Sequence, residues 1–196
     1  MFSSNEQNDA QELLRCLLDG LSAELNRVTE KPKYEELDFD ELPLHEQAKR
    51  WWQYSLKRED SVITDIFQGQ LLSRTTCTQC NHRSCAFDSF MDLQVPIQQA
   101  AEKAVLNLGY CLKTFVAKEK LKMPCSKCKH EVVKVRDMTV WRLPRVLVVH
   151  LKRFEANGYY KRKIETKIRI PHLLQMKDFA PYSGKFFFTK KRRRFN

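Results

Sequence analysis

The spacing of hydrophobic residues near the start of the chain predicts an amphipathic helix over residues 8–28. Leu13 and Leu18 widen a stripe of apolar side chains that recur at intervals of three and four residues: Ala10, Leu14, Leu17, Leu21, Leu25 and Val28. Asn8 is a candidate cap for the first turn, and Gln11 follows three residues later, as in a capping box. The sequence Lys31-Pro32-Lys33 then ends the helix.

A second helix is predicted over residues 46–57, after a polar and acidic loop at residues 33–45. Trp51 and Trp52 are adjacent, so they cannot both face one core stripe. We expect one of them to cover a neighbouring surface.

The pattern changes at Ser61, where short β-rich stretches begin. Residues 104–118 return to helical spacing, whereas residues 131–143 alternate between apolar and polar positions, which predicts a half-buried strand. A continuous apolar run at residues 145–154 predicts a strand that is buried on both faces. Residues 163–171 alternate again. Helices followed mainly by strands predict an α+β fold.

Composition restricts the class of protein. The chain has 196 residues, of which 42% are hydrophobic and 30% are charged, as in a soluble globular protein. We expect no membrane span, because no apolar run reaches about 18 residues. The first residues lack the basic and apolar regions of a secretory signal, so the seven cysteines are expected to be reduced.

The net charge of +11 is concentrated at one end of the chain. Residues 185–196 contain six Lys and Arg residues and no acidic residue, so they account for more than half of the net positive charge. An acidic stretch lies at residues 35–41. Because the body of the chain is only mildly basic, we expect no nucleic-acid partner.

Two Cys-x-x-Cys pairs are the clearest chemical signal. Four thiolates complete a tetrahedral zinc site, and these pairs supply four sulfurs: Cys77, Cys80, Cys125 and Cys128. Incidental free thiols are the alternative, and a redox site is disfavoured because no βαβ pattern surrounds either pair. The 44 residues between Cys80 and Cys125 would form an excursion whose base the metal closes.

Such a zinc ion is expected to be structural, because four protein sulfurs leave no open position for water. His82 and His130 lie beside the pairs and are alternative ligands, although we interpret them as surface histidines.

Several segments together resemble the ubiquitin-specific proteases. The stretch QNDAQELLRCLLDGL resembles their Gln-x-Asp-Ala-x-Glu helix, although Leu13 stands where the family usually has Phe. Four further stretches resemble the family in the same order: REDSVITDIFQGQLLSRTTCTQC, FDSFMDLQVPI, PCSKC followed by WRLPRVLVVHLKRF, and KIRIP. The resemblance covers about residues 2–182.

The resemblance implies a partial hand-shaped fold with a structural zinc ion in zinc-ribbon-like fingers. Residues 1–60 would be a thumb remnant, 61–140 the fingers, 141–184 part of the palm and 185–196 a basic tail. It also implies cysteine-type hydrolysis of the isopeptide bond that follows the ubiquitin C-terminus.

The family's catalytic residues are not matched in this sequence. The family's nucleophile lies in an Asn-x-Gly-Asn-Thr-Cys stretch upstream of the Gln-x-Asp-Ala helix, and its base lies in a Gly-His-Tyr motif downstream. Neither motif occurs here, so the chain is expected to be catalytically inactive. Cys16, Cys85, Cys111 and His150 are interpreted as packing residues.

The resemblance also places Asp9 and Glu12 against the arginine-rich tail of ubiquitin. A carboxylate accepts paired bonds from a guanidinium, although both acids also favour a helix N-terminus. Ubiquitin is therefore the expected partner, and the alternative is a zinc-stabilised adaptor that binds other proteins.

The basic cluster from Lys190 to Arg194 fits a nuclear-localisation signal, a phosphate-binding tail or the remainder of a shortened palm. A cytoplasmic or nuclear location is expected.

Overall fold

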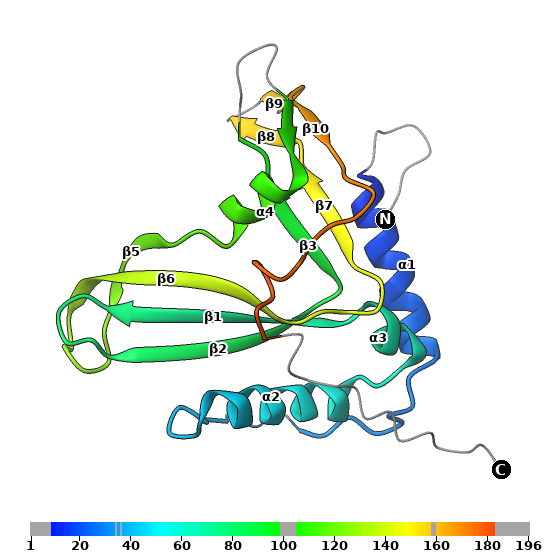
Figure 1. Cartoon of the computed structure of the whole chain (residues 1–196). Helices are drawn as coiled ribbons and strands as arrows, with labels where there is room; N and C mark the ends of the chain where they lie inside the picture. Colours follow the sequence, from blue (N-terminus) through cyan, green and yellow to red (C-terminus); the bar gives the residue numbers. More distant parts are fainter. Residues whose placement is uncertain (1–8, 34, 36, 99–104, 158–159, 183–196) are drawn as a thin grey trace.

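The structure is a computed structural model that describes residues 9–33, 35, 37–98, 105–157 and 160–182. Helices and sheets both contribute, which confirms the α+β class. Figure 1 shows a long sheet extending to one side, a helix beneath it, and smaller sheets beside the first helix. Asn8 and the basic cluster Lys190 to Arg194 lie outside the described residues.

Helix α1 spans Ala10–Glu24, so the prediction of a helix over residues 8–28 was too long at its C-terminal end. Asp9 is the N-cap, and its side chain accepts a hydrogen bond from the backbone N–H of Gln11. The buried side chains of α1 are those of Leu18 and Ser22, and Gln11 and Leu14 are partly buried.

The predicted apolar stripe of α1 covers more than one face of the helix. Four leucines lie exposed to solvent: Leu13, Leu17, Leu21 and Leu25. Three of them belong to the stripe that the spacing assigned to the core. The spacing was consistent with a helix, but it did not identify the side that the rest of the chain covers.

Helix α2 spans Leu44–Arg58 and helix α3 spans Val62–Phe67. Ser61 and Thr64 form a capping box at the start of α3. The Ser22 hydroxyl of α1 contacts both the Ser61 hydroxyl at 2.8 Å and the Glu59 carboxylate at 2.6 Å. This buried polar contact joins α1 to the segment between α2 and α3.

The long sheet, which we call the fingers sheet, contains four antiparallel strands in the order β2-β1-β6-β5. These are β1 (Gly69–Cys77), β2 (Arg83–Phe90), β5 (Glu119–Pro124) and β6 (Glu131–Arg142). Strand β6 confirms the strand that was predicted from alternation at residues 131–143.

The two adjacent tryptophans of α2 separate as expected. Trp51 packs against a cluster formed by Ala48 of α2 and three residues of the fingers sheet: Leu72, Phe87 and Trp141. The Arg142 guanidinium lies 4.2 Å from the centre of the Trp52 ring. Helix α2 therefore covers one face of the fingers sheet (Figure 1).

The predicted helix over residues 104–118 is divided in two. Strand β4 (Val105–Asn107) precedes helix α4 (Leu108–Phe115), and the Asn107 side chain caps the helix by accepting from the Tyr110 N–H. Leu108 and Leu112 are buried, because α4 packs into the main hydrophobic cluster.

Two small parallel sheets lie beside α1 and α4. Strand β3 (Asp92–Pro96) pairs with β7 (Val148–Lys152), and β4 pairs with β10 (Lys167–Arg169). The prediction of a strand buried on both faces over residues 145–154 was wrong, because β7 is shorter and its side chains are partly exposed. A strand in a two-stranded sheet lacks the neighbours that bury a central strand.

Strands β8 (Phe154–Asn157) and β9 (Tyr160–Lys163) form an antiparallel pair. The main hydrophobic cluster joins the small sheets to the base of the fingers sheet through Leu93, Val95, Leu112 and Val140. No helix in the described ranges is long and apolar enough to cross a bilayer.

Candidate metal centre and thumb contact

The two Cys-x-x-Cys loops have the same backbone geometry. In the first, the Cys77 N–H donates to the His82 carbonyl at 2.9 Å and the Asn81 N–H donates to the Cys77 carbonyl at 3.1 Å. In the second, the Cys125 N–H donates to the His130 carbonyl at 3.1 Å and the Lys129 N–H donates to the Cys125 carbonyl at 2.8 Å. Each loop is therefore a closed turn that holds its sulfurs on one side.

Each turn closes through a residue in the left-handed region of backbone space. Asn81 has φ of 56° and Lys129 has φ of 61°. Asn tolerates this conformation, whereas for Lys it costs roughly 1–2 kcal/mol. The tight turn at Lys129 is thus maintained against a local preference, which indicates that the position of the Cys125 loop is determined by its surroundings.

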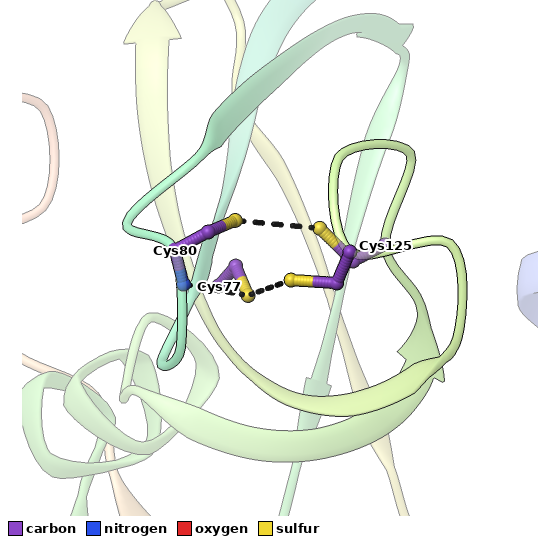
Figure 2. A group of neighbouring side chains, drawn as sticks. Cys77, Cys80 and Cys125 are labelled. Atoms are coloured by element: carbon purple, nitrogen blue, oxygen red, sulfur yellow. Dashed lines mark hydrogen bonds between the residues drawn. The ribbon is translucent and has the colours of Figure 1, made fainter.

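The four sulfurs meet between the loops. The Sγ atoms of Cys77 and Cys128 lie 3.8 Å apart, those of Cys80 and Cys125 lie 3.7 Å apart, and all four lie within 4.8 Å of one another. Figure 2 shows the labelled side chains of Cys80 and Cys125 pointing toward each other, with Cys77 beside them. All four are free thiols, so no disulfide explains this proximity.

The cluster fits a tetrahedral metal ion. Zinc–sulfur bonds of about 2.3 Å at tetrahedral angles place neighbouring sulfurs about 3.8 Å apart, close to the two shortest separations observed. Cys77 and Cys125 are buried, whereas Cys80 and Cys128 are more accessible. The arrangement that the two sequence pairs predicted is therefore present in the fold.

The surroundings shift the pKa values of three of the four thiols. The backbone N–H of Cys128 lowers the pKa of the Cys125 thiol to about 6, and the backbone N–H of Cys80 lowers that of Cys77. A hydrogen bond with the Cys80 sulfur, together with burial, raises the pKa of Cys128 to about 12. Cys77 and Cys125 therefore ionise more readily than an ordinary cysteine, but four adjacent thiolates require a positive ion.

The histidines beside the pairs are not part of the sulfur cluster. The His130 ring contacts the Cys128 carbonyl oxygen through Nδ1 at 2.7 Å and the Gln79 side-chain oxygen through Nε2 at 3.1 Å. His130 therefore bridges the two loops. The sequence contains a signal for this pairing, since both loops read Cys-x-x-Cys-x-His, but we did not predict the bridge.

Asp9 and Glu12 both lie exposed at the N-terminal end of α1. Asp9 occupies the N-cap and Glu12 the first turn, so the two carboxylates are adjacent but only Glu12 is within the helix. The Asp9 Oδ2 atom lies 3.9 Å from Nε2 of His150 on β7.

Two further contacts tie α1 to β3. The Gln11 side-chain amide donates to the Asp92 carboxylate at 3.0 Å, and Arg15 pairs with the other Asp92 oxygen at 3.3 Å. These contacts, which the sequence did not indicate, hold the first turn of α1 against the small sheet.

The remaining cysteines and His150 differ partly from prediction. Cys111 is buried, as expected, but Cys16 is exposed, so its interpretation as a packing residue was wrong. Cys16 lies on the uncovered side of α1 beside Leu13 and Leu17 in the sequence. His150, interpreted as a packing residue, is partly buried, but its Nδ1 atom has no hydrogen-bond partner among the described residues and its Nε2 atom lies 3.9 Å from Asp9, beyond hydrogen-bond distance.

Comparison with known proteins identifies the family. A sequence profile described as "Ubiquitin carboxyl-terminal hydrolase" matches residues 1–185. The chain belongs to the ubiquitin carboxyl-terminal hydrolase family. Human ubiquitin carboxyl-terminal hydrolase 2 is 39% identical over 184 residues, which cover 91% of this chain and 30% of that protein. Human ubiquitin carboxyl-terminal hydrolase 21 is 34% identical and is covered to 35%.

Chains of solved SAGA DUB modules share the fold. A SAGA Ubp8/Sgf11/Sus1/Sgf73 DUB module matches with a TM-score of 0.64 and 25% identity, over 90% of this chain and 36% of that one. A yeast SAGA DUBm structure with an Sgf73 variant gives a TM-score of 0.66 at 26% identity, covering 36% of its chain. The chain thus spans about a third of the length of these hydrolases.

Proposed function

We propose that the chain forms a zinc-stabilised, ubiquitin-contacting part of a deubiquitinating cysteine hydrolase. Its family membership supports the activity class, and the exposed carboxylates at the start of α1 support the contact with ubiquitin. The observation that carries the proposal is that Asp9 and Glu12 both lie exposed at the start of α1, with Asp9 3.9 Å from the His150 ring on β7.

The proposed metal is a structural Zn²⁺ ion held by Cys77, Cys80, Cys125 and Cys128. Borderline-soft zinc matches four thiolate ligands, and a complete sulfur shell leaves no position for substrate or water. The ion would therefore stabilise the end of the fingers sheet where β1 ends at Cys77 and β5 ends at Pro124, which we call the tip, and take no part in the chemical step.

The proposed ubiquitin contact is electrostatic. Glu12 makes no ion pair within the described part of the chain, and the one ion-pair contact of Asp9 there is with the His150 ring at 3.9 Å. Both carboxylates therefore remain available to guanidinium groups of the arginine-rich ubiquitin tail. A SAGA DUB module with the same fold has been solved bound to ubiquitin aldehyde, at 24% identity.

We assign no catalytic residue to the described ranges. Thiol hydrolysis needs a cysteine thiol within hydrogen-bond reach of a base, and no thiol in the described ranges is hydrogen-bonded to a histidine ring. Burial raises the pKa of the Cys85 and Cys111 thiols, which keeps them protonated at neutral pH. We therefore propose that these residues do not hydrolyse a fluorogenic ubiquitin conjugate, and that Cys16→Ser leaves any measured rate unchanged.

The test is a titration of the zinc-loaded chain with ubiquitin. Asp9→Asn keeps a good N-cap while it removes the charge, and Glu12→Gln preserves the shape of the side chain. We expect the double variant to bind ubiquitin about tenfold more weakly, as the loss of one or two charge-assisted contacts implies.

Asp19→Asn is the matched control, because Asp19 is an exposed carboxylate on the same helix. It should leave the affinity unchanged. Equal affinities for the double variant and the wild type would contradict the proposed contact.

A further inference from the structure

A cleft of about 530 Å³ crosses one face of the fingers sheet. Its lining includes Arg83 of β2, Arg74 and Thr76 of β1, Val135 and Asp137 of β6, and Lys118 just before β5. It lies away from α1, which Figure 1 places at the opposite end of the molecule from β5. The cleft is therefore separate from the proposed ubiquitin contact.

The cleft carries an excess of unpaired positive charge. Its one acidic lining residue, Asp137, is engaged by Arg74 through two hydrogen bonds of 3.3 and 2.7 Å. Arg83 and Lys118 are exposed and make no ion pair within the described part of the chain. Two cations are thus available to a negatively charged ligand.

Strand β5 extends this positive surface. Lys120 is paired with Val135, which lines the cleft, and directly opposed residues place their side chains on the same face of a sheet. Lys122 lies two residues further along and faces the same way. Both lysines are exposed and make no ion pair with any residue that the structure describes, whereas Glu119 on the other face pairs with Arg136.

The outer edge of β5 has no partner strand among the described residues, because β5 is the last strand of the order β2-β1-β6-β5. Its backbone groups are therefore available for the addition of another strand. Lysines on an edge strand oppose pairing with neutral or basic segments, but they favour a segment that carries acidic residues.

We propose that β5 and the adjacent cleft bind an extended acidic peptide segment of a partner protein. Alternate residues of a strand lie roughly 7 Å apart on one face, so acidic residues at every second position match the spacing of Lys118, Lys120 and Lys122. The residues that line the cleft include no aromatic ring, so the surface lacks the stacking platform that single-stranded nucleic acids use.

The test uses the zinc-loaded full chain and a fluorescein-labelled peptide of about ten residues, a length suited to one strand. Glu occupies alternate positions in the probe, separated by Thr and Val. Anisotropy is measured at about 0.1 M salt, where charge contacts are only partly screened. A second peptide has the same composition with its Glu residues grouped at one end.

We expect Lys120→Gln combined with Lys122→Gln to weaken binding about fivefold or more, since two exposed charge contacts are lost. The matched control is Lys57→Gln combined with Lys113→Gln, which removes the same charge from α2 and α4. The control should bind within twofold of the wild type, about 0.4 kcal/mol. The grouped peptide should bind more weakly than the alternating one.

Four results would overturn the proposal. These are no binding, equal losses in the two double variants, equal affinity for the two peptides, and tighter binding of single-stranded DNA of matched charge. Zinc content of each variant confirms that the fingers sheet is folded. Asp9→Asn with Glu12→Gln should not change peptide binding, so failure of the ubiquitin contact is distinguishable from failure of this site.

Discussion

The tip of the fingers sheet and helix α1 differ in how far the rest of the chain covers their apolar surface. At the tip, Cys77, Cys125 and Val132 are each at most 4% exposed, although they form a cluster of only three buried residues. On α1, Leu13 and Leu17 are 55% and 56% exposed. The three-residue cluster at the tip is thus better buried than the leucines of α1.

The difference follows from how each region is closed. Two strand pairs bring the cysteine loops together, and a metal ion can replace a hydrophobic core that is too small to be stable alone. Helix α1 has contacts along one side with α3 and β3, and its leucines on the other side remain in solvent. A contiguous row of exposed leucines is typical of a surface that other protein covers.

The largest effect is expected from removing one metal ligand. Cys125→Ser should abolish zinc binding and remove stabilisation on the order of 10 kcal/mol from the tip. Hydrogen exchange should then show fast exchange in the cysteine loops while the amides of α3 keep their protection. Cys16→Ser, on exposed α1, is the control and should change neither. Persistent protection of the loops in Cys125→Ser would show that the metal is not needed there.

A second prediction compares the loss of stability when a buried leucine and an exposed leucine are each replaced by alanine. Leu72 of the fingers sheet is 2% exposed, and Leu72→Ala should lower the free energy of unfolding by about 3 kcal/mol. Leu17→Ala should cost less than about 1 kcal/mol, because water already reaches that side chain. Urea denaturation measures both values. A similar cost for the two variants would indicate that α1 is covered in solution, for example by self-association.

Replacing two glycines by alanine is expected to change the free energy of unfolding by smaller amounts and in opposite directions. A Cβ at Gly69 would lie 2.8 Å from the Arg142 carbonyl oxygen, so Gly69→Ala should destabilise the fingers sheet by about 2 kcal/mol. A Cβ at Gly20 of α1 meets nothing within 4 Å.

Gly20→Ala should therefore raise stability by about 0.5–1 kcal/mol through helix propensity alone. Thermal unfolding of the two variants measures the difference. A loss of stability in Gly20→Ala would contradict the uncovered position of that helix face.

The sequence predicted the parts of the fold whose signal is local. Alternation over residues 131–143 gave β6, and the two Cys-x-x-Cys pairs gave the four residues that meet at the tip. Both signals depend on short-range geometry, namely the two-residue period of a strand and the turn that places two sulfurs together.

Features that depend on distant parts of the chain were not predictable in the same way. The spacing of leucines in α1 defines a helix but does not identify which side meets α3. The apolar run around β7 indicated complete burial, but β7 has β3 as its partner in a two-stranded sheet. Helix α4 begins at Leu108, later than the helical spacing from residue 104 predicted, because the Asn107 side chain caps its N-terminus.

The most direct test of the central claim is the metal content and coordination of the purified chain. We expect one zinc ion per chain, and X-ray absorption should show four sulfur neighbours at about 2.3 Å. A preparation that lacks bound metal yet keeps the fingers sheet folded, or a zinc ion with nitrogen or oxygen in its shell, would contradict the account.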